Sequence, residues 1–153
     1  MIPTQDLLSI LLAILFGSAI GLERQWSGKA AGLRTNVLIC LGAAVFTIIS
    51  ERMAAPNSDI TRIAAQIVTG VGFLGAGAII QDRGGIKGLT TAATIWLVSS
   101  IGMACGAGLY ALAAVAALSA VLVLIGLAKL ERSFQHLSKD RTKPPAGPQQ
   151  GDI

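Results

Sequence analysis

The sequence predicts an all-α membrane protein with five transmembrane helices. Of the 153 residues, 53% are hydrophobic and only 13% are charged, and the mean hydropathy is +0.69. Soluble domains carry about 25% charged residues, so this composition lacks the polar side chains needed to cover a water-exposed surface. The charges of the chain, +4 in total, lie between long apolar runs. Because they form no single basic patch, we expect the chain to lie in a lipid bilayer and not to bind nucleic acid.

Four uncharged runs define the expected spans: residues 7–22, 35–50, 63–81 and 90–128. An apolar helix needs about 20 residues, and at least about 17, to cross a hydrocarbon core of about 30 Å. The first three runs are therefore single, short spans. The fourth would be nearly twice the membrane thickness as one helix, at about 1.5 Å per residue. We expect it to fold back at residues 106–108, where two glycines permit a turn.

The distribution of Lys and Arg predicts the orientation of the spans. With the loop at residues 23–34 in the cytoplasm, ten Lys and Arg residues lie on the cytoplasmic side and two, Arg52 and Arg62, on the other. Because cytoplasmic loops carry the excess of positive charge, the amino terminus is expected outside and the carboxyl terminus inside. Residues 1–130 then form the membrane domain. Residues 131–153, which are charged and then rich in Pro and Gly, predict a disordered cytoplasmic tail.

The loops at residues 23–35 and 82–91 resemble each other. Each contains an acid-Arg pair, a glycine, a lysine and then Gly-Leu-x-Thr at the start of the next apolar run, although the alignment needs a gap. Each loop also joins an inward-running span to an outward-running one. We therefore predict two helical hairpins that form a parallel repeat, with the fifth helix unpaired. Chance similarity between two short basic loops is the alternative.

Such a repeat gathers the polar residues of both loops on one cytoplasmic surface. The short first span draws Glu23 and Arg24 to the membrane boundary, where a mutually paired cluster reduces the cost of each charge. Thr and Asn at the expected starts of the second and fourth helices suit helix caps, because their oxygens accept hydrogen bonds from free N–H groups. Ordinary interfacial anchoring is the alternative to a functional cluster. The candidate functional polar cluster comprises Glu23, Arg24, Gln25, Arg34, Thr35, Asn36, Asp82, Arg83, Lys87, Thr90 and Thr91.

Glycines recur along the spans, and small residues let membrane helices approach closely. In the third span the alternative is a locally broken helix, which would expose carbonyl groups to an ion or water path. The Gly-x-Gly-x-x-Gly string that begins at Gly70 has no strand before it and lies in an apolar run, so it does not indicate nucleotide binding. The predicted helix-packing residues are Gly17, Gly21, Gly70, Gly72, Gly75, Gly77, Gly102 and Gly106.

The sequence predicts neither catalytic residues nor a metal centre. No His, Cys or carboxylate group has metal-ligand spacing, and no nucleophile lies beside a base. We therefore expect no enzyme activity and no cofactor. Glu23 and Asp82 offer oxygen ligands for a weak association with hydrated Mg²⁺, for which the neighbouring Arg and Lys side chains would compete. Cys40 and Cys105 are expected to be free, buried thiols.

Several motifs together resemble the MgtC/SapB family of bacterial inner-membrane proteins. They are Gly-x-x-x-Gly-Leu-Glu-Arg-Gln at residues 17–25, Gly-Leu-Arg-Thr-Asn at 32–36, the run at 62–77, and Gly-Leu-Thr-Thr-Ala-Ala at 88–93 followed by Trp96. The resemblance implies a five-helix inner-membrane domain linked to growth at low magnesium and, in pathogens, to survival inside macrophages. Longer members add a soluble carboxyl-terminal domain, which is not expected here. The polar family positions fall on Glu23, Arg24, Gln25, Arg34, Thr35 and Asn36.

Two functions follow from these observations. The first is a non-enzymatic regulator of magnesium and membrane-energy homeostasis that contacts a membrane partner; the resemblance implies the proton-translocating ATP synthase as that partner. The alternative is an oligomeric transporter or channel for Mg²⁺ or another small solute, which the repeat and the glycine-rich third span favour. Five short helices leave little room for a pathway in one protomer, so we expect a homo-oligomer. A purely structural role is a third hypothesis.

Overall fold

The computed structural model describes residues 3–54, 61–82 and 85–141. Its described part is helical apart from one short hairpin, which confirms the predicted all-α class. The four longest helices are α1 (Thr4–Trp26), α2 (Leu33–Met53), α4 (Leu89–Gly106) and α5 (Tyr110–Arg141). The remaining helix is α3 (Thr61–Gly77), and strands β1 (Ile80–Asp82) and β2 (Gly85–Lys87) form an antiparallel pair. Sequence analysis missed this hairpin because strands of three residues have no measurable periodicity.

Helices α1, α2 and α4 and the first 21 residues of α5 are long and apolar enough to cross a membrane. Helix α3 has 17 residues and is not among these candidates in the described chain. Its crossing of the bilayer therefore stays a prediction, as does the orientation of the termini. The predicted fold-back is confirmed, because α4 ends at Gly106, Gly108 has a φ of 70°, and α5 begins at Tyr110.

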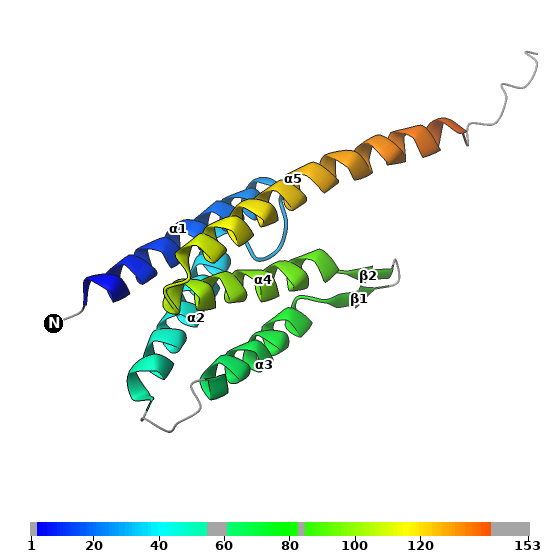
Figure 1. Cartoon of the computed structure of the whole chain (residues 1–153). Helices are drawn as coiled ribbons and strands as arrows, with labels where there is room; N and C mark the ends of the chain where they lie inside the picture. Colours follow the sequence, from blue (N-terminus) through cyan, green and yellow to red (C-terminus); the bar gives the residue numbers. More distant parts are fainter. Residues whose placement is uncertain (1–2, 55–60, 83–84, 142–153) are drawn as a thin grey trace, which may run out of the picture.

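Helix α4 occupies the centre of the bundle and contacts each of the other four helices. Helices α1, α3 and α5 run in one direction, while α2 and α4 run in the other (Figure 1). As a result the α1–α2 loop and the β1–β2 hairpin lie at the same end of the bundle (Figure 1). We call this end the loop end. The parallel repeat predicts that both loops lie at one end of the bundle, as they do here.

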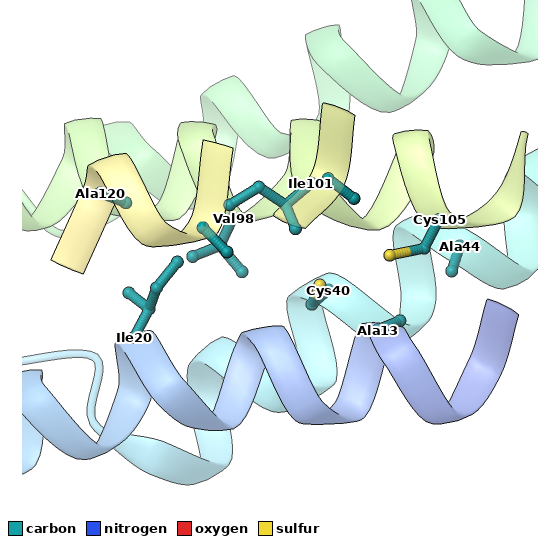
Figure 2. Close-up of a cluster of buried hydrophobic side chains, with 10 residues drawn as sticks. Ala13, Ile20, Cys40, Ala44, Val98, Ile101, Cys105 and Ala120 are labelled. Carbon is teal, nitrogen blue, oxygen red and sulfur yellow. The ribbon is translucent and has the colours of Figure 1, made fainter. Parts of the chain in front are cut away.

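Small side chains fill the core between α1, α2, α4 and α5. Ala13, Cys40, Ala44 and Cys105 belong to one buried cluster with the larger Ile101 (Figure 2). Both cysteines are buried free thiols, as predicted. The narrow space between these helices requires residues of small volume, since membrane helices gain contact area by close backbone approach.

Four of the predicted packing glycines lie where two helices meet. A Cβ atom on Gly17 would lie 2.9 Å from the Cβ of Cys40, and one on Gly21 would lie 2.8 Å from the Cα of Leu33. On α4, a Cβ on Gly102 or Gly106 would collide with carbonyl oxygens of α2. These positions bring α2 close to both α1 and α4.

The glycines of α3 behave differently. A Cβ atom on Gly70, Gly72 or Gly77 would meet no atom within 4 Å, and one on Gly75 would make ordinary contact with Ala92 at 3.6 Å. The first three therefore make no close helix contact within the chain, and a packing role for them stays a prediction. Helix α3 lies at the edge of the bundle, and Gly70 lines a groove between α2 and α3. The alternative of a broken third helix is wrong for this glycine-rich segment, since α3 is continuous from Thr61 to Gly77.

The predicted helix caps need correction. The caps of α2 and α4 are Gly32 and Gly88, with no side-chain cap hydrogen bond, and not the Thr and Asn residues that follow. Gly88 has a φ of 92°, a conformation that glycine adopts at little cost. Helix α5 continues to Arg141, and a disordered tail after it stays a prediction. Residues 142–153 lie outside the described part.

Candidate functional site

A polar pocket of about 650 Å³ lies at the loop end of the bundle. The last turn of α1, the loop after it, strand β2 and the first turn of α4 form one side, and α5 closes the other. We call it the Arg24 pocket. Its polar lining consists of Glu23, Arg24, Ser27, Lys29, Thr90 and Thr91, and its α5 lining consists of Val123, Leu124, Leu127 and Ala128.

Arg24 and Glu23 are the buried charges of this pocket. They are consecutive residues of α1, and only 4% of Arg24 and 8% of Glu23 is exposed. The Nη1 atom of Arg24 lies 3.8 Å from Oε2 of Glu23. Burial of a charge is costly unless an opposite charge and hydrogen bonds compensate it, so each side chain depends on the other.

Two hydroxyl groups hold this pair in place. Ser27 Oγ, one helical turn after Glu23, donates a hydrogen bond of 2.7 Å to Glu23 Oε1. Arg24 Nη2 donates to Thr91 Oγ1 over 3.4 Å, which links the end of α1 to the start of α4. The contact thus connects the two halves of the predicted repeat through a cation and a hydroxyl group.

Part of the bonding capacity of the pair is unused. Glu23 Oε2 and Arg24 Nε are buried and have no hydrogen-bond partner among the described residues. Buried polar atoms of proteins are normally paired, so unsatisfied atoms at the wall of a pocket indicate a place for a bound polar group. The unused Arg24 N–H is a donor, suited to an anionic or carbonyl oxygen.

The α1–α2 loop owes its shape to two amide side chains. Gln25 Oε1 accepts a hydrogen bond of 3.3 Å from the backbone N–H of Leu33. Asn36, which is fully buried, donates through Nδ2 to the carbonyl oxygens of Ala31 and Gly32. These bonds fix the chain between α1 and α2 and so hold Arg24 at its place beside α4.

A sequence model of the MgtC family matches residues 10–133. The chain belongs to the MgtC family. Over 102 residues it is 53% identical to protein MgtC of Salmonella typhimurium, an alignment that covers 67% of this chain and 43% of the relative. Protein MgtC of Brucella abortus is 49% identical over 111 residues, 72% of this chain and 46% of the relative.

A protein of Synechocystis, slr0014, is 42% identical over 132 residues, 86% of this chain and 56% of the relative. The chain therefore spans about half the length of the curated MgtC-family relatives it matches. No solved structure matches it.

The MgtC-family fold brings together only some of the predicted polar cluster. Glu23, Arg24, Thr90 and Thr91 line the Arg24 pocket, whereas Gln25 and Asn36 organise the loop beside it. Arg34 and Thr35 line a separate groove between α2 and α3, because their position on α2 turns them away from α5. Lys87 lies on β2 with its side chain exposed. The Asp82 side chain and Arg83 are outside the described part.

Sequence reasoning missed several residues of the pocket. Ser27 follows Glu23 by four residues, and this helical spacing was a usable signal for their hydrogen bond. Lys29 was used as a topology signal and as part of the repeated loop motif, but it was not placed in the polar cluster. The α5 wall had no signal, because an apolar span does not reveal which of its faces closes a pocket. In the described ranges no group of three or more His, Cys, Asp or Glu residues could hold a metal ion.

Proposed function

We propose that this MgtC-family chain is a non-enzymatic regulator of magnesium and membrane-energy homeostasis in the bacterial inner membrane. The observation that carries the proposal is family membership, with relatives named MgtC at 53% and 49% identity. The chemistry of the described part agrees with it. The Arg24 pocket contains one paired carboxylate and two cations, an arrangement suited to binding and positioning rather than to nucleophilic attack.

Regulation requires a surface for a membrane partner, and α3 offers one. Gly70 and Gly77 lie on one face of this edge helix, and a Cβ atom added at either would meet no atom within 4 Å. Phe73, also on α3, is 82% exposed. Small residues beside an exposed aromatic ring suit close helix–helix contact in a bilayer, and the ATP synthase is the partner that we propose. The same face also suits a second copy of the chain.

Growth at low magnesium tests the proposed role. A strain that lacks the gene should grow poorly when magnesium is limiting and normally when it is plentiful. Wild-type protein should restore growth, whereas Arg24→Gln should not, although Arg52→Gln at the other end of the bundle should. Equal growth of the deletion and wild-type strains at limiting magnesium would contradict the proposal.

Crosslinking tests the partner. A photoreactive residue in place of Phe73 should capture a subunit of the ATP synthase in native membranes, and one in place of Leu118, exposed on α5, should not. Capture of a second copy alone would contradict the proposed contact with the ATP synthase and would favour a homo-oligomer.

Transport is the second candidate, because a buried carboxylate, Glu23, lines an open polar pocket. Purified protein in liposomes that contain a magnesium-sensitive dye distinguishes the two functions. Transport predicts an Mg²⁺ flux that Glu23→Gln and Asp82→Asn abolish, whereas regulation predicts none. A flux that both variants abolish would favour the transporter.

A further inference from the structure

We propose that the Arg24 pocket, together with the apolar groove beside it, binds one anionic phospholipid. The headgroup phosphate would lie against Arg24 and the first turn of α4, and one acyl chain would lie between α4 and α5. This inference goes beyond the proposed regulatory function and does not depend on it, since lipid binding is measured on the purified chain.

The two cavities adjoin. The groove has a volume of about 310 Å³ and runs between α4 and α5, and Thr90, Val123 and Leu124 line both the groove and the Arg24 pocket. The groove continues past Ala93 and Leu97, away from the loop end. A polar chamber that opens into an apolar channel is complementary to an amphiphile, which has a polar headgroup and an apolar chain.

The polar chamber is suited to an anion. The Nε atom of Arg24 is buried and has no hydrogen-bond partner among the described residues, and a guanidinium group matches the geometry of a phosphate. Lys29 adds a second cation at an exposed position of the lining. Glu23 offsets one of these charges, but its Oε1 atom already accepts a hydrogen bond from Ser27. The charged lining of the described part therefore sums to one positive charge, from two cations and one carboxylate.

The first turn of α4 reinforces this preference. Gly88 to Thr91 line the pocket, and the cap residue, Gly88, supplies no side-chain hydrogen bond to the helix start. The first N–H groups of a helix have no acceptor within the helix and carry about half a positive charge, which attracts phosphate.

The apolar wall indicates a lipid rather than a free phosphate. Val123, Leu124 and Leu127 face the chamber from α5, and a small hydrated ion would gain nothing from them. The chamber also lies at the end of the apolar helices, which is the depth of lipid headgroups in a bilayer.

Native mass spectrometry of the delipidated full chain in a neutral detergent tests the proposal. The probes are phosphatidylglycerol, phosphatidylcholine and glycerol 3-phosphate. We expect phosphatidylglycerol to bind at least about tenfold more tightly than phosphatidylcholine, because a buried guanidinium group favours a net negative headgroup. Arg24→Gln should remove most of this difference, and Lys29→Gln, at an exposed residue, should reduce it.

A second pair of variants tests the groove without touching a charge. Ala93→Phe places a ring in the groove and should weaken binding of phosphatidylglycerol, while Ala114→Phe, exposed on α5 outside the groove, should not. Equal binding of the two lipids would overturn the proposal. So would full competition by glycerol 3-phosphate together with no effect of Ala93→Phe, which would assign the pocket to a free phosphate compound.

Discussion

Arg24 joins parts of the chain that are far apart in sequence. Its guanidinium group lies beside the preceding carboxylate, Glu23, and reaches Thr91 on α4. The buried pair therefore has two effects: it neutralises charge inside the loop end of the bundle, and it links α1 to α4. A substitution at this residue affects both.

Removing one charge of the pair should be more harmful than removing both. Arg24→Gln leaves the Glu23 carboxylate buried without its cation, and the loss of one member of a buried pair costs about 3–5 kcal/mol. The double variant with Glu23→Gln should recover part of this loss. Thermal unfolding in detergent, followed by circular dichroism, measures the difference.

The matched control is the ion pair between Arg52 and Asp6 at the other end of the bundle, 2.6 Å long and with 53% of the Arg52 side chain exposed. Arg52→Gln should cost only about 0–1 kcal/mol, since exposed pairs contribute little. Equal losses for Arg24→Gln and Arg52→Gln would contradict the role given to burial.

Gly88 offers a second prediction at this scale. Its φ of 92° costs a residue with a Cβ atom about 1–2 kcal/mol, and that atom would also collide with the carbonyl of Ala78. Gly88→Ala should therefore lower the unfolding temperature and shift the start of α4. Gly126→Ala, where a Cβ would meet nothing within 4 Å, is the control and should not lower the unfolding temperature, because Ala is the better helix former.

Among the helices, glycine has two different roles. On α4 it lets the backbone of α2 approach, because Gly102 faces the carbonyl of Cys40 and Gly106 that of Ala44. On α3, by contrast, a Cβ atom added at Gly70, Gly72 or Gly77 would meet no other helix of the chain. Sequence spacing alone does not separate these roles, because both occur in equally apolar runs.

The difference can be measured with single methyl groups. Gly102→Ala must push α4 away from α2 and should destabilise the bundle by about 1–3 kcal/mol, as overpacking usually does. The Cβ atom of Gly70→Ala meets no atom within 4 Å, so this variant should be at least as stable as the wild type. If Gly102→Ala unfolded at the wild-type temperature, the close approach of these helices would be refuted.

Much of the architecture was predictable from the sequence. The lengths of the apolar runs predicted four of the helices, and the glycines at residues 106 and 108 predicted the turn between α4 and α5. The site was predictable in part: an acid-Arg pair after a short span indicated Glu23 and Arg24. The rotation of α2, which turns Arg34 toward α3, was not predictable, since it depends on how Gly17 and Gly21 pack.

For the whole molecule, the decisive property is that both loops lie at one end. Impermeant maleimide labelling of vesicles tests this arrangement in the bilayer. Ser27→Cys and Ile86→Cys should react from the same side, and Met53→Cys and Leu109→Cys from the opposite side; the native residues at all four positions are exposed. The wild-type protein is the control and should not react with the maleimide, since Cys40 and Cys105 are buried. Labelling of positions 27 and 86 from opposite sides would refute the parallel repeat.

The central position of α4 also has a consequence for biosynthesis. Helices α1 and α2 contact each other and can associate as soon as both have left the ribosome, but most neighbours of α3 belong to α4. Until α4 is inserted, α3 has little to hold it in the bilayer besides its own short apolar run. A nascent chain stalled before residue 89 should therefore leave α3 accessible to membrane proteases, and one released after residue 110 should protect it.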